Sequence, residues 1–505
     1  MIAALLILQA ATSAVTAVPG FERSPPMAEE RIALPHVADA LRAANPIARR
    51  ASLDTALYLL PKPTRFRGAV QCLRGAALLS ADVVANKLPG SVAIDECHRL
   101  NPDVPLARRM RADTAFLNDD VRTGATLLAQ AISADSQLAR GLKEDQLDTV
   151  FRQLGYAGAT AERRALVVAL SKTDAARDNA ARYSGWVRAG VLDRVEKGDL
   201  AGAGALLPYI VDPADALTML VDRRYEPLWP RVDEWAGGDL VRQRDALVAA
   251  ARAAHAADPE LSRARALADV LARTGHAPEA VTVLTQAVAA FGTPRDDYDY
   301  ARAVVKLSGV TAAAGERDAR RILAPMRAAL AGGVAGPMLV NVVPNLAISQ
   351  IALDRPADAL ATLDRYPIDV SKVETAQAFG YFVAIRGCAE AKLGRAARAR
   401  AALATVTRDY AANLGAVDLA TGCIGDDAQV LARWLARVDD PDTRSGALLA
   451  MYGEQAGTSD DRLAVNKHAL RAISTRAEVR AKLAQYGRAP AAGYLPAMRG
   501  WRATP

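Results

Sequence analysis

The sequence predicts an all-α fold in which antiparallel helical hairpins repeat along the chain. Apolar residues recur at spacings of three and four, which places them on one face of a helix. Turn residues recur about every 40 positions, and alternating β-branched runs joined by Asn-Gly turns are scarce. Aromatic residues make up only 5% of the chain and alanine is abundant, which suits closely packed helices.

The N-terminal stretch, residues 1–17, is typical of a secretory signal peptide. An apolar run from Ile2 to Leu8 precedes small residues and a cleavage site ending at Ala17. No Lys or Arg precedes the run, and it is shorter than the roughly 20 apolar residues of a membrane span. We therefore expect a cleaved signal, a mature chain without a transmembrane span, and a periplasmic or secreted location. An uncleaved anchor and an ordinary apolar N-terminus are the alternatives.

Residues 18–65 form a proline-containing segment. Pro25-Pro26 and Pro61-Lys62-Pro63 bracket a short helical pattern, HVADALRAANPIARR. Because the residue before a proline is biased away from the helix, these prolines predict a linker and a capping helix. The repeat array is expected to follow, over residues 66–465.

The clearest hairpin is LADVLARTGHAPEAVTVLTQAVAA, residues 267–290. Leu267 and Leu271 lie on one face of the first helix. Gly275 supplies the backbone freedom that a helix C-terminus often uses. Pro278 stands where a second helix begins, a position at which its missing N–H costs nothing. The stretch therefore predicts two helices joined by a tight turn.

The same turn recurs along the chain. In the best copies a small residue follows five positions after the turn and a leucine four positions later, whereas the copy at Gly315 has Arg320 in the small-residue place. A single hairpin cannot bury both of its apolar faces, so the copies are expected to stack in tandem. The equivalent turn residues are Asp119, Gly158, Gly198, Gly315, Asp354, Gly394 and, in a looser copy, Asp439.

The pattern resembles the tetratricopeptide (TPR) repeat family, with units longer than the usual ~34 residues of that family. The residues that carry the resemblance are Leu267, Ala268, Gly275, Ala280, Leu284 and Ala287, together with Gly387, Gly394, Ala399 and Leu403. The resemblance implies an αα-hairpin solenoid, a right-handed superhelix whose first helices line a concave groove for a protein partner. By matched position, the residues that project into this groove are Arg265, Asp269, Arg302, Lys306 and Asn345.

The four cysteines form two pairs along the sequence, Cys72 with Cys97 and Cys388 with Cys423. In an exported protein an even count predicts disulfides, and each pair lies within about one repeat, so local pairing is favoured. The alternative is four buried free thiols. No pair has the Cys-x-x-Cys spacing, which argues against redox catalysis and against a zinc site.

The segment DRRYEPLWPRVDEW, residues 222–235, concentrates side chains of the kinds that dominate interface hot spots. Two prolines also interrupt the helical pattern there, so an altered unit is expected. We expect Arg223, Tyr225 and Trp229 either to bind a partner or to fill a widened joint between repeats.

Residues 466–505 are expected to form a basic C-terminal helix and tail. They carry eight Lys and Arg residues against one acid, Glu478, and their net charge of +7 equals that of the whole chain. The sequence pI near 9.2 therefore reflects this end alone. It is expected either to contact an anionic envelope surface or to be a solvated end. Nucleic acid is not an expected partner of an exported protein.

Motifs for catalysis or cofactor binding are missing from the sequence. It has no phosphate-binding loop, no His-Glu-x-x-His and no Gly-x-Ser-x-Gly, and its five histidines are scattered. We therefore predict no catalytic residue, no metal and no cofactor. The leading hypothesis is a non-catalytic, exported protein-protein interaction scaffold. The alternative is a cell-envelope enzyme or enzyme subunit, for example a peptidoglycan-related one, with a helical superstructure.

Overall fold

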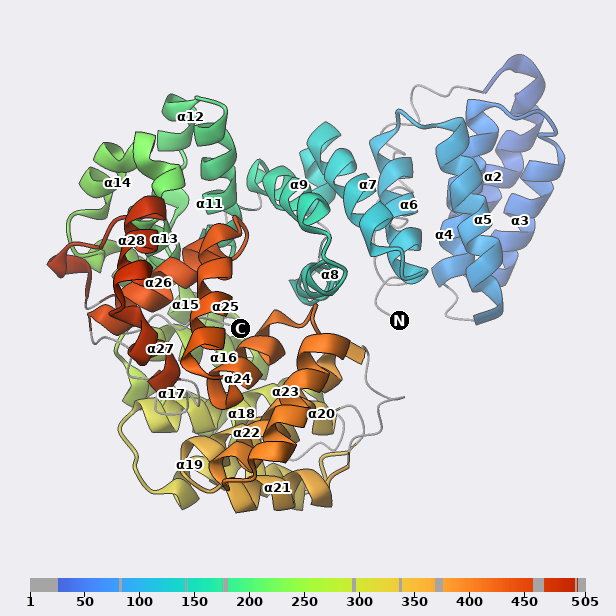
Figure 1. Ribbon diagram of the computed structural model, residues 1–505. Helices are drawn as coiled ribbons and strands as arrows, with labels where there is room; N and C mark the ends of the chain where they lie inside the picture. The colour runs from blue at the N-terminus through green and yellow to red at the C-terminus, as the bar shows by residue number, and fades with distance from the viewer. Residues whose placement is uncertain are drawn as a thin grey trace. The chain divides into compact units, whose positions relative to one another are not determined.

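The computed structural model confirms the all-α hairpin-repeat fold (Figure 1). It describes residues 26–80, 84–140, 142, 144–174, 176, 180–292, 297–335, 338–367, 376–456, 467–495 and 497. Within these ranges there are helices and one isolated β-bridge, and no strand. The expected signal peptide lies outside the described residues.

The chain divides into two compact units, Met1–Asn179 and Ala180–Pro505, which we call the N-terminal unit and the C-terminal unit. Their boundary lies inside the segment 66–465 that the repeat pattern treats as one array. Each unit is described by itself below.

The first described helices of the N-terminal unit pack around a small core of their own. Residues 28–58, part of the proline-containing segment, pack against α4 around a core that includes Ala40, Leu53 and Val70. Helix pairs α4–α5, α6–α7 and α8–α9 follow, and α7 also packs on α9. The helices of this unit are η2 (Ala28–Ala33), α2 (Leu34–Arg42), α3 (Pro46–Tyr58), α4 (Arg65–Ser80), α5 (Val84–Leu100), α6 (Pro105–Leu117), α7 (Val121–Ala134), η3 (Ser136–Ala139), α8 (Glu144–Tyr156) and α9 (Thr160–Ser171).

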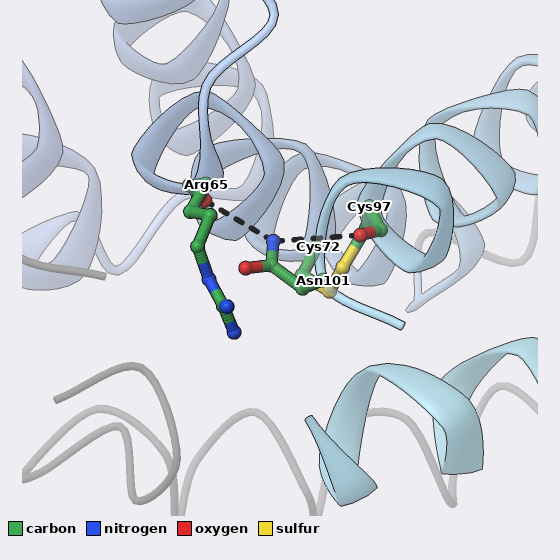
Figure 2. The surroundings of a disulfide bond; sticks show 4 residues. All are labelled: Arg65, Cys72, Cys97 and Asn101. Atoms are coloured by element: carbon green, nitrogen blue, oxygen red, sulfur yellow. Dashed lines mark hydrogen bonds between the residues drawn. A yellow bond between two sulfur atoms is a disulfide. The ribbon is translucent and has the colours of Figure 1, made fainter. Parts of the chain in front are cut away.

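A cysteine pair joins the two helices of the first hairpin (Figure 2). Cys72 on α4 and Cys97 on α5 lie at disulfide distance, with their Cα atoms 5.2 Å apart, and both are buried. Just past the end of α5, the Asn101 side-chain amide donates to the carbonyl oxygens of Cys97 at 3.4 Å and Arg65 at 3.1 Å. The amide thus ties the start of α4 to the end of α5.

The C-terminal unit contains the longer run of hairpins. Pairs α16–α17, α18–α19, α20–α21 and α22–α23 follow one another, and the first helices α16, α18, α20, α22 and α24 pack in that order. The helices up to α17 are α11 (Ala180–Glu196), α12 (Leu200–Gly204), η4 (Leu207–Tyr209), α13 (Pro213–Val221), η5 (Arg223–Leu228), α14 (Trp229–Ala236), α15 (Val241–Ala257), α16 (Leu261–Arg273) and α17 (Ala277–Phe291). The remaining ones are α18 (Tyr298–Ala313), α19 (Ala319–Ala331), α20 (Leu339–Ala352), α21 (Pro356–Arg365), α22 (Ala376–Lys392), α23 (Ala396–Asp409), α24 (Leu414–Ile424), α25 (Asp427–Asp439), α26 (Arg444–Gln455), α27 (Lys467–Ser474), α28 (Ala477–Tyr486) and η8 (Ala492–Tyr494).

The predicted turn residues share one backbone conformation. Seven of them have a left-handed φ, between 59° at Asp354 and 98° at Gly315. In each of these turns the next amide donates to the carbonyl five residues before it, for example His276 to Leu271 at 2.7 Å. This is the Schellman closure of a helix C-terminus, which satisfies carbonyls that the helix leaves unpaired. The seven residues are Asp119, Gly158, Gly198, Gly275, Gly315, Asp354 and Gly394.

Two copies differ from the clearest hairpin, one in the length of its loop and the other in its turn. After Gly315 the second helix begins only at Ala319, two residues later than in the hairpin after Gly275, where it begins at Ala277. The buried positions therefore shift by two, and Ile322, 1% exposed, occupies the place that Ala280 has in the clearest copy. In the looser copy, Asp439 is the last residue of α25 and not a left-handed turn residue.

Alanine brings the helices of the C-terminal unit together. Its main apolar core runs without interruption from Leu247 to Ala420. Fully buried alanines such as Ala268, Ala280 and Ala359 recur where helices meet. A methyl side chain lets two backbones approach closely, which explains how the core closes with few aromatic residues.

A second cysteine pair links two first helices of this unit. Cys388 on α22 and Cys423 on α24 lie at disulfide distance, with a Cα–Cα separation of 5.3 Å. Both cysteine pairs are therefore placed as the local pairing expects, and no cysteine of the chain is left unpaired.

The end of the C-terminal unit returns to its beginning. Helices α25 to α28 pack together, and α26 packs against α13 (Figure 1, red against green). The isolated bridge, between Asp222 and Gly487, also joins the end of this unit to its beginning. The sequence analysis did not predict this contact.

Candidate partner-binding surface

The five residues predicted to project into a groove lie on three successive first helices. Arg265 and Asp269 are on α16, Arg302 and Lys306 on α18, and Asn345 on α20. All five are half-buried. Because these helices pack in order, their polar residues follow one another across the face of the apolar core.

Asp269 is the centre of this surface. Its carboxylate accepts from Lys306 Nζ at 2.5 Å and from Arg273 Nε at 3.0 Å. Burial alone raises the pKa of Asp269, but the charges of Lys306 and Arg273 outweigh it and hold that pKa below the usual value. Asp269 is thus a fixed anion between two cations.

The ionic chain continues toward the start of the C-terminal unit. Arg273 Nη1 donates to the Asp212 carboxylate at 2.8 Å, and Asp212 caps the N-terminus of α13. One turn further along α13, Asp215 accepts from Arg188 Nε of α11 at 2.8 Å. Burial raises the pKa of Asp215, with Asp212 adding to the effect and Arg188 opposing it.

Four residues of this ionic chain were not among the predicted site residues: Arg188, Asp212, Asp215 and Arg273. Arg273 lies four positions after Asp269 on one helix, a spacing at which opposite charges pair. Asp212 precedes a proline at the start of a helical pattern, which is a capping signal. Arg273 and Asp212 could therefore have been inferred from the sequence. The Arg188–Asp215 pair joins helices of different hairpins, so no short spacing in the sequence indicates it.

The other groove residues also have partners inside the chain. Arg265 pairs with Asp299 at 3.4 Å. The Arg302 guanidinium lies over the Tyr298 ring, 5.3 Å from its centroid. The Asn345 amide donates to a backbone carbonyl one turn back on α20 at 2.7 Å. The surface therefore presents side chains that are already held in place.

The three residues of the interrupted segment have different surroundings. Tyr225 is fully buried, and burial raises its pKa. Trp229 is half-buried and donates from Nε1 to the Met219 carbonyl at 3.0 Å. Arg223 is exposed and lies 3.7 Å from Glu226. The Tyr225 side chain is thus part of the packed interior, while Arg223 and part of Trp229 are open to solvent.

A buried acid anchors the same segment. Asp222 is 0% exposed and accepts from Arg224 Nη2 and from Ser445 Oγ of α26, both at 2.6 Å. Burial raises the pKa of Asp222, but the hydrogen bonds from Arg224 and Ser445 outweigh it and hold that pKa below the usual value. Asp222 therefore fixes the interrupted segment to the last part of the unit.

The basic C-terminal end is folded as far as Leu495. Residues Lys467–Ser474 and Ala477–Tyr486 form α27 and α28, and a short 3-10 turn follows. Three of its cations are paired at 2.6 Å, Arg476 with Asp427, Lys482 with Asp439, and Arg488 with Asp233. Up to Leu495, this end is thus a packed part of the unit and not a solvated tail.

An apolar hollow lies among the last hairpins of the array. A pocket of about 460 Å³ lies between α21, α22 and α23, lined by Leu363, Phe379 and Phe382, with the pair Arg386–Asp364 also in its lining. The described residues contain no group of three or more His, Cys, Asp or Glu side chains placed to hold a metal ion. None of the helices that the structure describes combines the length and apolar composition needed to span a bilayer.

Comparison with known proteins identifies no relative by sequence. No family model and no curated protein matches the chain. Among solved structures it is similar to the TPR domain of P58(IPK), at 12% identity and a TM-score of 0.19 over 91% of this chain and 99% of that one. It is also similar to the APC/C hetero-tetramer Cut9-Hcn1, at 12% identity and a TM-score of 0.25 over 89% of this chain and 97% of that one. The TPR-like character of the array rests on its own hairpins and turns.

Proposed function

We propose that the chain is a non-catalytic, exported scaffold that holds another protein against the first helices of its C-terminal unit. The observation that carries this proposal is the row of half-buried, mutually paired charges from Lys306 through Asp269 and Arg273 to Asp212. Lys306, Asp269 and Arg273 lie on the successive first helices α18 and α16, the face that a helical-hairpin array offers to a partner, and Asp212 extends the row to the N-terminus of α13.

The pairing makes this row suitable for recognition. Side chains that are already oriented lose little conformational entropy when a partner docks. Alternating charge also discriminates between partners, because a like charge opposite a fixed carboxylate or guanidinium is costly. The row therefore favours a partner whose own charges alternate in the complementary order.

Export is supported by the apolar N-terminal stretch and by the two cysteine pairs at disulfide distance. Disulfides persist in the periplasm or outside the cell and are rare in a reducing cytosol. A reporter enzyme that is active only after export, fused after residue 30, tests this point. Activity that depends on residues 1–17 is expected.

Affinity capture from envelope extracts tests the scaffold proposal. The wild-type chain is compared with the double variant Asp269→Asn, Lys306→Gln, which removes both charges with little change in side-chain shape. A partner captured by the wild type and lost from the double variant is expected.

The matched control removes a similar ion pair from second helices. Arg252 on α15 and Glu279 on α17 pair at 2.7 Å, and Arg252 is exposed while Glu279 is half-buried. The double variant Arg252→Gln, Glu279→Gln should capture as much partner as the wild type. Equal capture by all three proteins, or no partner above background for the wild type, contradicts the proposal.

A further inference from the structure

The last residues of the C-terminal unit are bound like a peptide ligand. Arg488 donates from both terminal nitrogens to the Asp233 carboxylate, at 2.6 and 3.0 Å, and from Nε to the Leu220 carbonyl at 2.7 Å. Its guanidinium also lies over the Trp229 ring, 4.2 Å from the centroid. A bidentate carboxylate, an aromatic face and a backbone acceptor match the donors and the plane of a guanidinium. We call Leu220, Trp229 and Asp233 the arginine pocket.

The backbone around Arg488 is fitted as closely as its side chain. The Arg488 amide donates to the Val221 carbonyl at 2.9 Å, and Gly487 bridges to Asp222 in antiparallel fashion. A Cβ added at Gly487 would lie 2.5 Å from the Val221 carbonyl oxygen, so only glycine fits this position. The segment is therefore recognised through its main chain, as extended peptides are when they bind by strand addition.

A second anchor lies farther along the same segment. Tyr494 is 5% exposed, and it is hydrogen-bonded to the backbone of Gly238. A Cβ at Gly493 would meet the Gly238 carbonyl, so the chains again touch backbone to backbone. The C-terminal segment, Gly487–Leu495, thus has two anchor points, Gly487-Arg488 and Gly493-Tyr494, with exposed Ala489 and half-buried Pro490 between them.

We propose that the arginine pocket is a peptide-binding site for an extended segment carrying Gly-Arg, and that the C-terminal segment is its detachable resident ligand. A partner peptide of the same chemistry would take the pocket by displacing residues 487–495. The anchoring ion pair remains open to water, since the side chains of Arg488 and Asp233 are 32% and 43% exposed. This inference extends the proposed scaffold function by naming one ligand class, and its tests use no partner protein, so the two can fail separately.

The first test measures release of the segment in the full chain. Trypsin cleaves after Arg488 only when that side chain leaves the pocket. Asp233→Asn, which keeps the shape and removes the charge, should raise the initial cleavage rate at this bond about tenfold or more, because cleavage tracks the open population. The matched control is Asp427→Asn, which removes the partner of another basic residue of this end, Arg476, and should leave this rate unchanged.

The second test measures binding of a free peptide. The probe is a fluorescent nonapeptide with the sequence YGRAPAAGY of residues 486–494. The receptor is the full chain with Gly487→Ala and Arg488→Ala, in which hydrogen exchange over residues 487–494 should report release. Binding is expected to this variant and not to the wild type. A peptide with Lys in place of Arg should bind about tenfold more weakly, because an ammonium cannot pair bidentately or stack.

Three outcomes would overturn the proposal. The segment in the double variant stays protected from exchange, so that the pocket is not what holds it. The vacated chain fails to bind the probe, or binds it equally well after a further Asp233→Asn change. The wild-type chain binds the probe as tightly as the vacated chain, so that the resident segment does not occupy the site in solution.

Discussion

Replacing a turn glycine by alanine should loosen its hairpin, whereas the same replacement three residues earlier should tighten it. Gly158 has a φ of +60° and closes the turn between α8 and α9, and Gly155 lies within α8. An added Cβ would meet nothing within 4 Å at either position. The two sites therefore differ in backbone conformation alone, and Gly155→Ala is the matched control for Gly158→Ala.

The magnitudes follow from the two conformations. An L-residue held in the left-handed region costs roughly 1–2 kcal/mol, so Gly158→Ala should destabilise the turn by about that much. In a helix, alanine is favoured over glycine by roughly 0.5–1 kcal/mol, so Gly155→Ala should stabilise it. Since about 1.4 kcal/mol is a factor of ten, exchange governed by opening of the turn should become about 5–30-fold faster in the first variant and about 2–5-fold slower in the second.

Hydrogen exchange reads this change at one amide. The Ala159 N–H donates to the Leu154 carbonyl at 2.9 Å, which is the bond that closes the turn. Gly275→Ala repeats the test at the clearest hairpin, where φ is +91° and the space around the Cβ is also open. Equal exchange in Gly158→Ala and the wild type would refute the left-handed assignment and, with it, the physical basis of the repeat.

Three further predictions concern the electrostatics and covalent links of the fold. Hydrogen bonds hold the pKa of Asp222 below its usual value, so the stability that they contribute is present above the ordinary carboxyl range near pH 4 and is lost as pH falls through the folded-state pKa. Urea unfolding at a series of pH values should therefore show that Asp222→Asn loses less unfolding free energy in acid than the wild type. Asp269→Asn should lower the unfolding free energy of the C-terminal unit by about 0.5–1 kcal/mol, a small value because the carboxylate is 37% exposed. The measurement is amide hydrogen exchange, which should become faster in α16 and α18 but not in α22. Reduction of the Cys72–Cys97 pair, 25 residues apart, should lower the unfolding free energy of the N-terminal unit by about 3.5 kcal/mol through loop entropy. The unfolding temperature should fall when reductant is added, and the double variant Cys72→Ser, Cys97→Ser should have the lower temperature without reductant.

Local chemistry explains why the repeat was predictable from sequence. A left-handed turn residue restricts the side chain at that position, and Gly or Asp meets the restriction, so Gly275 and Asp354 mark the turns directly. The copy at Gly315 shows the limit of a fixed count. Its longer loop moves the buried positions that correspond to Ala280 and Leu284 by two, to Ile322 and Met326, and Arg320 then falls on the exposed side. In this copy the repeat spacing located the hairpin, but a fixed count from the turn did not give the buried positions of its second helix.

The groove residues show a second limit. First helices carry the predicted groove residues, because the helix on which a residue lies depends on local pattern: Arg265, Asp269, Arg302, Lys306 and Asn345. Whether such a charge faces solvent or another charge depends on the neighbouring helix. The Lys306–Asp269 pair joins residues 37 positions apart, close to one repeat length, so charges at equivalent places in adjacent repeats should be examined as pairs.

The contact between Arg488 and the arginine pocket lies beyond any such rule, because it joins residues 255 positions apart, across the whole run of hairpins between them. Each hairpin adds a small rotation, and the sum over many units decides whether the two ends meet. Gly487 is the C-cap of α28 and Gly493 lies in η8, yet neither has the positive φ that such places often require. Their requirement is close backbone approach, at the Val221 and Gly238 carbonyls. From sequence alone these two glycines are therefore indistinguishable from ordinary helix-end and turn glycines. Comparing Gly487→Ala with Ala489→Ser separates close backbone approach from simple flexibility, because only the first should expose the bond after Arg488 to trypsin.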